Sequence, residues 1–337
     1  MTALCVDELA DRIRQGDRKA LAQAITVIES TRSDHRSAAE SLLEQLMPDS
    51  GRAIRIGITG VPGVGKSTFI ESFGLNLLAR GKHVAVLAID PSSATSGGAI
   101  LGDKTRMPNL SVMPNAFIRP SPAGRTLGGV ARRTHESMLL CEAAGFDVLL
   151  IETVGVGQSE FLVSQMTDLF LLLILPSAGD DLQGIKRGIM ELADMVVINK
   201  ADGDLTNRAR IAQADVKNAL GLMQPRLPGW KVPVSTVSST QQIGIDDVWQ
   251  QVMNYFEHID AGPGLKDLRA NQAIENLWRE AGEHLMSALQ AFEVADSTLT
   301  SLRDQVAGGE IPASVAARQL VEWFLDSKSR GSPPKVN

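Results

Sequence analysis

Residues 60–68 read Gly60-Val61-Pro62-Gly63-Val64-Gly65-Lys66-Ser67-Thr68, which is a complete G-x-x-x-x-G-K-S/T phosphate loop. The glycines leave room for consecutive backbone N–H groups to surround a triphosphate. An apolar run at 53–59 precedes the loop, and a segment with helical apolar spacing follows at 67–80, as this motif requires. We expect Lys66 to reach the β- and γ-phosphates and the Ser67 hydroxyl to ligate Mg²⁺. A glycine-rich loop without a ligand is the alternative interpretation.

A second motif, Asn199-Lys200-Ala201-Asp202, follows a short apolar run that ends at Ile198. This position is the carboxyl end of a predicted strand, where open α/β sheets bind their ligands. The Asp202 carboxylate can accept hydrogen bonds from N1–H and the 2-amino group of guanine, and adenine offers neither donor there. An ordinary turn with an aspartate cap is the alternative. Together with the phosphate loop, the motif predicts that the chain binds GTP and hydrolyses it to GDP.

Further candidate groups follow other predicted strands of the same sheet. Asp90 comes after the second strand, Asp103 lies in the glycine-rich stretch beyond it, and Glu152 begins a Glu-Thr-Val-Gly sequence. A carboxylate at a strand end can hold Mg²⁺ directly or through water. Gly155 leaves its backbone N–H free to approach the γ-phosphate. In isolation Asp90 and Asp103 would be helix caps or loop carboxylates, but beside a phosphate loop they favour metal and water positioning.

Composition limits the class of protein. The 337 residues are 44% hydrophobic, enough for one large α/β domain with helical additions. The net charge of −6 argues against nucleic acid as a partner. Cys5 and Cys141 are far apart without metal spacing, so we expect reduced thiols in a cytoplasmic protein. We expect no membrane association either, because the longest apolar stretch, Leu169 to Pro176, is too short to span a bilayer.

The order of patterns predicts four regions. Residues 1–50 are expected to form a helical extension, with helices at 6–15, 18–29 and 37–47. Residues 51–262 are expected to form the nucleotide-binding domain, an α/β fold whose mostly parallel, doubly wound sheet is covered on both faces. Its expected strands are 53–59, 83–89, 116–119, 147–152, 168–175, 195–199 and 233–237.

The rest of the chain lacks strand patterns. Residues 263–327 are expected to form a C-terminal helical arm, entirely helical from 265 to 326, and residues 328–337 a disordered tail. The arm carries an apolar stripe that either packs on the arm's own core or forms a dimer seam. The stripe comprises Ile274, Leu277, Trp278, Leu285, Leu289 and Phe292.

From Gly57 to Asp204 the sequence resembles the SIMIBI class of P-loop GTPases, and more narrowly the branch called MeaB, ArgK or methylmalonic aciduria type A protein. The segments that carry this resemblance are Gly60 to Thr68, Asp90-Pro91-Ser92-Ser93, Gly98 to Met107, Glu152 to Glu160, Gly179 to Gly188 and Asn199 to Asp202. The likeness extends over nearly the whole chain. It implies a homodimeric GTPase chaperone that binds an adenosylcobalamin-dependent acyl-CoA mutase, typically methylmalonyl-CoA mutase, gates cofactor loading and protects the mutase from inactivation.

The resemblance also implies roles for individual residues. Asp90, Asp103 and Glu152 would be the acids of the Mg²⁺ and hydrolytic site, beside Lys66 and Ser67. In the segment 179–188, Asp180, Gln183 and Lys186 would form a switch that reports the nucleotide state to the partner. The loop that supports guanine usually contains Ser-Ala, whereas this chain has Ser238-Ser239-Thr240. A serine there retains the backbone N–H that can meet guanine O6.

Other functions remain open from the sequence. Relatives have been named kinases or ATPases of a lysine/arginine/ornithine transport system, although Asp202 should reject adenine. A nucleotide-binding scaffold with incidental hydrolysis is a third interpretation. Delivery of nickel or zinc is disfavoured, because none of the five histidines lies in ligand spacing with a cysteine. No glutamine directly follows Gly155 to orient water, so we expect slow hydrolysis that a partner accelerates.

Overall fold

The computed structural model describes residues 5–30, 32–89, 106–120, 127–153, 159–176, 187–262, 264–295 and 297–329. It divides into two compact units, Met1–Ala270 and Asn271–Asn337, which are described separately below. The predicted positions Asp90, Asp103, Gly155 and the switch residues Asp180, Gln183 and Lys186 lie outside the described residues, as does the tail from residue 330.

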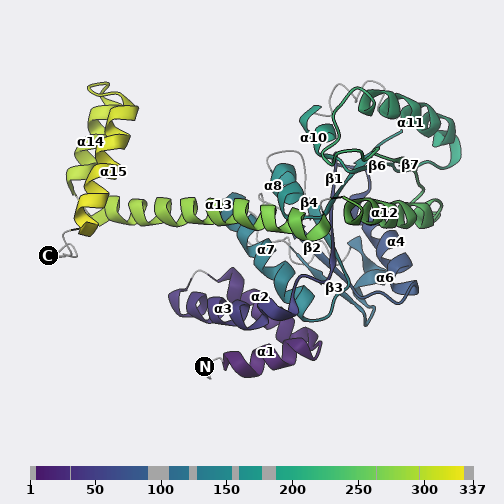
Figure 1. Ribbon diagram of the computed structural model, residues 1–337, viewed down its shortest axis with the longest axis horizontal. Coiled ribbons are helices and arrows are strands. Elements are labelled where there is room, and N and C mark those ends of the chain that lie inside the picture. Colours follow the sequence, from purple (N-terminus) through teal and green to yellow (C-terminus); the bar gives the residue numbers. More distant parts are fainter. Residues whose placement is uncertain are drawn as a thin grey trace. The chain divides into compact units, whose positions relative to one another are not determined.

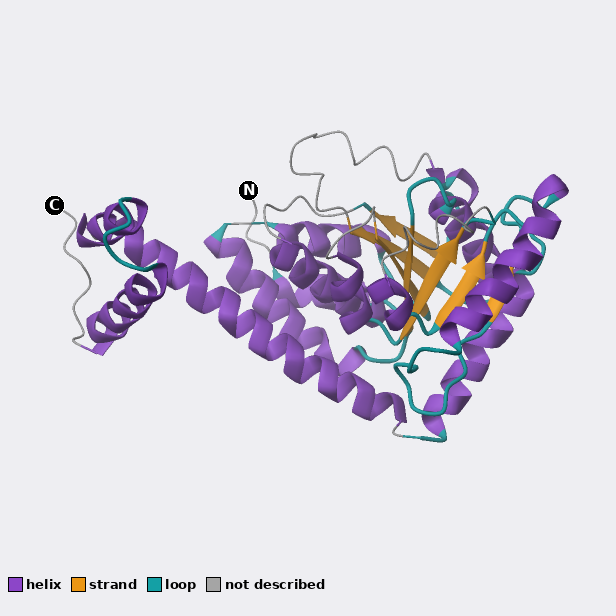
Figure 2. Cartoon of the chain, turned by 90° about the horizontal axis from the view of Figure 1, so that it is seen from above, coloured by secondary structure: helices purple, strands orange, loops and turns teal. Residues whose placement is uncertain are grey.

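The first unit is built around a seven-stranded sheet with the order β3-β2-β4-β1-β5-β6-β7. Every strand pairing in it is parallel. Helices lie on both sides of the sheet in Figures 1 and 2, which confirms the predicted α/β class and doubly wound sheet. The strands are β1 (Ile54–Gly60), β2 (Val84–Ile89), β3 (Ala116–Arg119), β4 (Val148–Thr153), β5 (Leu169–Ile174), β6 (Met195–Ile198) and β7 (Val234–Thr236).

Both faces of the sheet are buried, which explains why its central strands are continuous apolar runs. Ile56 and Ile58 of β1 belong to a core that includes Phe69 and Phe73 of α4 (Lys66–Ala79). On the opposite face, the core contains Leu149 of β4 and residues of α7 (Leu127–Ala143). The alternation of side chains along each strand therefore holds one layer of helices on each face.

The remaining helices of this unit complete the two layers. The N-terminal helices α1 (Val6–Arg14), α2 (Arg18–Glu29) and α3 (Ser33–Leu46) contribute to the same core as α7. The third helix begins at Ser33, four residues before the predicted start, and Asp34 in its first turn favours that start through the helix dipole. The other elements are η1 (Met47–Asp49), α6 (Pro108–Ser111), α8 (Ser159–Met166), α10 (Arg187–Leu192), η3 (Gly203–Leu205), α11 (Thr206–Leu220) and α12 (Ile245–Asp260).

Buried ion pairs fix the amino ends of β1 and β5. Arg55 donates to both oxygens of the Glu142 carboxylate at 2.7 and 2.8 Å, and both side chains are buried. Asp168 accepts from the backbone N of Arg55 at 2.8 Å and from the guanidinium of Arg269 at 2.7 and 2.8 Å. Arg269 also donates to the carbonyls of Gly51 and Ala53 at 2.6 Å. The strand that leads into the phosphate loop is thus anchored at its start.

The second unit is helical and begins within α13 (Gly264–Ala295). The prediction of unbroken helix from 265 to 326 is wrong, because residues 308–312 separate α14 (Ser297–Ala307) from α15 (Ala313–Ser329). Gly309 adopts a φ of +75°, and Gly308 donates to the carbonyl of Asp304 at 2.7 Å, so a glycine C-cap ends α14.

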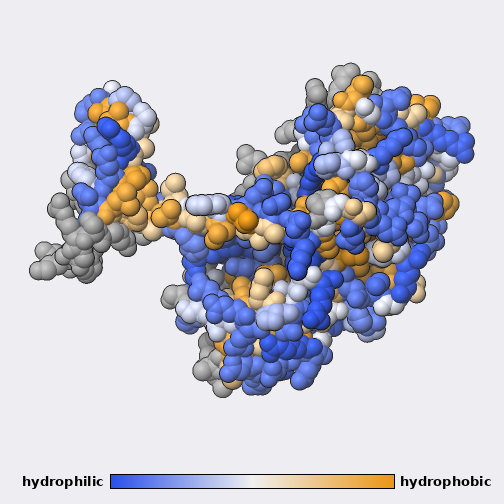
Figure 3. Space-filling model, in the orientation of Figure 1, coloured by the Kyte–Doolittle hydropathy of each residue, from blue (hydrophilic) through white to orange (hydrophobic). Residues whose placement is uncertain are grey.

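The predicted apolar stripe of α13 is largely exposed on this chain. The relative exposures are 56% for Ile274, 63% for Leu277, 74% for Trp278 and 62% for Leu285. Figure 3 shows apolar surface along α13 and beside α15. The first four stripe residues are therefore not packed on a core of the arm itself. Within the described ranges, no helix has the length and apolar character needed to cross a membrane.

Candidate functional site

The phosphate loop connects β1 to α4 at the carboxyl edge of the sheet. Gly65, which precedes α4, has a φ of +92°, and a Cβ there would lie 2.8 Å from Nδ2 of Asn199. A Cβ at Gly60 would lie 2.6 Å from the carbonyl oxygen of Leu173. Glycine is therefore required at these two positions by the close approach of β5 and of the Asn199 motif.

Lys66 is the first residue of α4 and is partly buried. Its Nζ donates to the carbonyl of Gly60 at 2.7 Å, so the side chain curls back over the loop. Burial lowers the pKa of the Lys66 ammonium, while Glu152 and Glu160 oppose this shift and Arg106 adds to it. A partly desolvated ammonium, whose charge is stabilised by two nearby carboxylates, is suited to bind a phosphate.

Ser67 and Glu152 meet at the carboxyl edge of the sheet. Glu152 is in β4, next to β1, and is only 4% exposed. The Ser67 hydroxyl donates to Oε1 of Glu152 at 3.2 Å. The structure thus brings together the phosphate-loop hydroxyl and the strand-end acid that the sequence proposed as Mg²⁺ ligands.

The first half of the Asn199-Lys200-Ala201-Asp202 motif braces the phosphate loop. Nδ2 of Asn199 donates to the carbonyl of Val64 at 2.9 Å, and Nζ of Lys200 donates to the carbonyl of Gly63 at 2.7 Å. Lys200 has a φ of +60°, unusual for a residue with a side chain. The sequence predicted a motif that contacts guanine, and gave no sign that its first two side chains reach the loop from β6.

Asp202 lies beside the loop that follows β7. One of its carboxylate oxygens, Oδ2, accepts from the hydroxyls of Ser238 and of Thr240, the latter at 3.1 Å. The Ser238 hydrogen bond, supported by Thr240, holds the pKa of Asp202 below its ordinary value against the opposing effect of desolvation. The carboxylate is therefore ionised at neutral pH and fixed in orientation.

Ser239 joins the two loops. Its hydroxyl donates to Oδ1 of Asn199 at 2.7 Å, and its backbone N lies 3.4 Å from the same oxygen. Because Asn199 also donates to Val64, a continuous hydrogen-bonded chain runs from the phosphate loop to the 238–240 loop. The predicted positions Gly60 to Thr68, Asn199 to Asp202 and Ser238 to Thr240 thus form one region at the carboxyl edge of the sheet.

Sequence reasoning assigned no role to Glu160. This residue, in the first turn of α8, is 1% exposed and raises the pKa of Lys66. The available signal was its place as the last residue of the 152–160 segment, but its burial depends on how α8 packs.

The parallel sheet, the phosphate loop after β1 and the guanine motif after β6 define a P-loop GTPase. The family model described as "Methylmalonyl Co-A mutase-associated GTPase MeaB" matches residues 21–293. The chain belongs to this family, as its resemblance to the MeaB branch predicted.

Similar proteins differ in what their names state, and two of those described below are named GTPases. A Caulobacter vibrioides protein, named only as a GTPase, is 53% identical over 96% of this chain and 98% of its own length. GTPase ArgK of Escherichia coli is 44% identical, over 93% and 95%. The mouse methylmalonic aciduria type A homolog is 43% identical, over 95% and 79%. A solved structure described as an LAO/AO transport system kinase matches with a TM-score of 0.77 and 37% identity, covering 96% of this chain and 99% of that one. The chain is therefore a GTPase.

Proposed function

We propose that this GTPase is a chaperone of an adenosylcobalamin-dependent acyl-CoA mutase, with methylmalonyl-CoA mutase as the partner, and that it gates cofactor loading and protects the loaded mutase. The observation that carries the nucleotide part is the fixed, ionised carboxylate of Asp202, hydrogen-bonded through Ser238 and Thr240. The partner part rests on the family, whose description names association with methylmalonyl-CoA mutase.

Mg²⁺ fits the groups at this edge of the sheet. Ser67 and Glu152 supply hard oxygen donors 3.2 Å apart, and Mg²⁺ in phosphate-loop sites takes few protein ligands because waters and phosphates supply the others. Within the described ranges, no cluster of three acidic, histidine or cysteine side chains could hold a metal ion by itself. When bound, the ion would neutralise charge on the β- and γ-phosphates. Asp90 and Asp103 remain proposed contributors.

Hydrolysis would proceed by in-line attack of water on the γ-phosphate. Lys66 would stabilise the charge that develops on the phosphate oxygens, together with the backbone N–H groups of residues 60–68. Glu152 would hold the Ser67 hydroxyl, and Gly155 would sense the γ-phosphate. We propose that turnover is slow alone and that the partner accelerates it by ordering the switch residues Asp180, Gln183 and Lys186.

We also propose a cytoplasmic homodimer, in which the C-terminal arm of residues 263–327 forms the dimer contact. The exposed Ile274, Leu277, Trp278 and Leu285 support this, because an apolar helical stripe without a core of its own favours a partner helix. Cys5 and Cys141 are both free thiols, which suits a reducing compartment.

The test is GTP hydrolysis measured with and without the mutase from the same organism, with ATP as the control. Strong stimulation of GTP turnover, and none with ATP, supports the proposal. A basal rate that already equals the stimulated rate contradicts slow, partner-dependent turnover. Tight GTP binding with no effect of the mutase contradicts the chaperone role and leaves the GTPase assignment intact.

A transport-system kinase is the second candidate, favoured by the name of the similar solved structure. Asp202 argues against it, since its ionised carboxylate needs the donors of guanine. Preference for ATP over GTP in a competition assay would reverse this ranking.

A further inference from the structure

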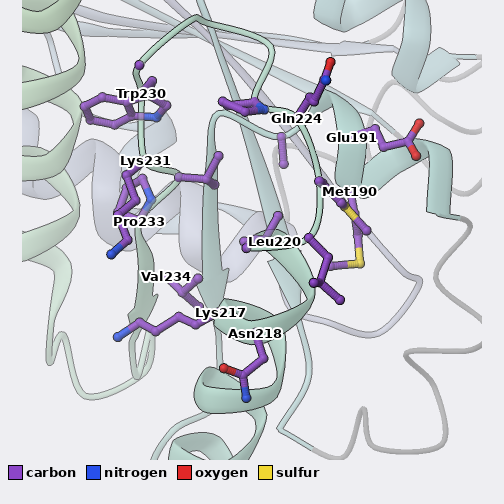
Figure 4. Close-up of a pocket in the computed structure, with 17 residues that line it drawn as sticks. Met190, Glu191, Lys217, Asn218, Leu220, Gln224, Trp230, Lys231, Pro233 and Val234 are labelled. Atoms are coloured by element: carbon purple, nitrogen blue, oxygen red, sulfur yellow. The ribbon is translucent and has the colours of Figure 1, made fainter.

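A preformed pocket lies at the amino ends of β6 and β7, the edge of the sheet opposite to the nucleotide site, and Figure 4 shows residues that line it. Its volume is about 900 Å³, and its walls are α10, the end of α11 and the connection 221–233. This connection of 13 residues without secondary structure is long for a compact domain, where most connections have about 4–6 residues.

The connection is held in place by contacts with its surroundings. Trp230 donates from Nε1 to the carbonyl of Asp194 at 2.8 Å, and Arg226 pairs with the Asp194 carboxylate at 3.2 Å. His258 of α12 lies 3.2 Å from the carbonyl of Pro228. The pocket wall is therefore built before any ligand arrives, which reduces the entropic cost of binding.

The lining combines an apolar floor with a charged rim. Met190, Leu220 and Val232 contribute the apolar surface. Figure 4 shows Lys217 and Lys231 on one side of the pocket and Glu191 on the other. Both lysines are exposed, in a chain whose net charge is −6. The lysine side is thus a local positive rim on an acidic protein.

Leu222 also lines the pocket and is 90% exposed. Flexible methionine side chains adapt to different apolar partners, and Met190 and Met223 both line the pocket. An open, apolar depression beside two lysines suits a peptide segment that inserts an apolar side chain and places carboxylates next to the lysines. It suits a small molecule less well, since small ligands are usually enclosed.

We propose that this pocket docks an acidic segment, with an apolar anchor residue, of the partner mutase. This inference rests on the proposed function. The helix α10 begins at Arg187, directly after the predicted switch residue Lys186 in the sequence, and Met190 and Glu191 of α10 line the pocket. Docking would therefore contact the element that continues from the switch, and partner binding would be linked to the nucleotide state.

The test compares matched variants of the full chain by measuring affinity for the mutase in the presence of a non-hydrolysable GTP analogue. The pocket variants are Lys217→Glu/Lys231→Glu and Leu222→Asp. Their controls are Arg208→Glu/Lys19→Glu, with the same change in net charge at exposed sites outside the pocket, and Ile211→Asp, at a 63% exposed apolar residue of α11. GTP affinity and basal hydrolysis should stay unchanged in all four.

We expect each pocket variant to weaken mutase binding at least tenfold and each control to change it less than twofold. Binding by the unaltered protein should weaken with salt, and the double lysine variant should show a shallower dependence. Mutase binding that is as tight in the pocket variants as in the unaltered chain would overturn the docking site while the proposed function stands. Failure of the unaltered chain to bind the mutase would overturn both.

Discussion

Replacement of Asp202 by asparagine should change the nucleotide preference from guanine to xanthine. The hydroxyls of Ser238 and Thr240 both donate to Oδ2 of Asp202. In the variant, the amide oxygen should take the Oδ2 position, because the amide NH₂ cannot accept from these hydroxyls. The NH₂ group would then face the base, where it opposes the 2-amino group of guanine and matches the 2-oxo group of xanthine.

The size of the effect follows from the hydrogen bonds exchanged. A hydrogen bond to a charged group contributes about 1.5–3 kcal/mol, so loss of the ionised acceptor should cost GTP about 3 kcal/mol, or roughly a hundredfold in affinity. Xanthosine triphosphate should gain in affinity relative to GTP. The assay is displacement of a fluorescent guanine nucleotide from the unaltered protein, and of a fluorescent xanthine nucleotide from the variant.

The matched control is Asp204→Asn, which removes one charge at an exposed residue two positions further along. It should leave both affinities unchanged. Unchanged GTP affinity in the Asp202→Asn variant would refute the assignment of Asp202 to the base. Equal loss of both nucleotides, with an unchanged melting temperature, would refute the orientation argued from Ser238 and Thr240.

Three further changes probe the site and its support. Gly65→Ala should reduce nucleotide affinity more than Gly63→Ala in the same displacement assay, because both have positive φ but only the Cβ at 65 meets an atom, at 2.8 Å; equal losses would contradict the close approach. Asp168→Ala should lower the free energy of unfolding in urea by about 3–5 kcal/mol, since it leaves the guanidinium of Arg269 without its carboxylate, and a loss under 1 kcal/mol would contradict this. Burial raises the pKa of Asp194 to about 6, so this carboxyl group binds a proton more tightly in the folded protein than in the unfolded chain. Its contribution to the free energy of unfolding should therefore fall by about 3 kcal/mol as pH rises from about 4 to about 6. Asp194→Asn should remove that slope, and identical pH profiles of the two proteins would contradict the raised pKa.

The sheet could be predicted from sequence because its strands are buried on both faces. Leu169 to Ile174, for example, is apolar at every position and buried throughout. The ends of helices were harder to predict. The break at 308–312 depends on Gly309, whose positive φ ends α14, although the flanking segments both have helical spacing. Helical spacing of apolar residues predicted both segments, whereas the end of α14 depends on the backbone conformation of Gly309.

The sequence predicted the motifs of the candidate site, but not the ion pairs and hydrogen bonds that hold these motifs in place. Arg55 and Glu142, or Asp168 and Arg269, lie far apart in the sequence, and each carries a charge that local pattern assigns to the surface. Glu142 lies in α7 and Arg269 in α13, so these pairings depend on how the two helices pack against β1 and the start of β5. The strand order places Asn199 against the phosphate loop, so its role as a brace could not be read from the spacing of the motif.

The hydrogen-bonded chain from Val64 through Asn199 to Ser239 bears on how specificity and catalysis are joined. Asn199 uses its Nδ2 to hold the phosphate loop and its Oδ1 to hold the 238–240 loop. A guanine that engages Asp202 and this second loop therefore stabilises the same asparagine that shapes the phosphate loop. Under the proposed assignment, base recognition would contribute to the arrangement of Lys66 and Ser67, because Asn199 is hydrogen-bonded to both loops. A nucleotide with the wrong base would lose base contacts and would also meet a less ordered phosphate site.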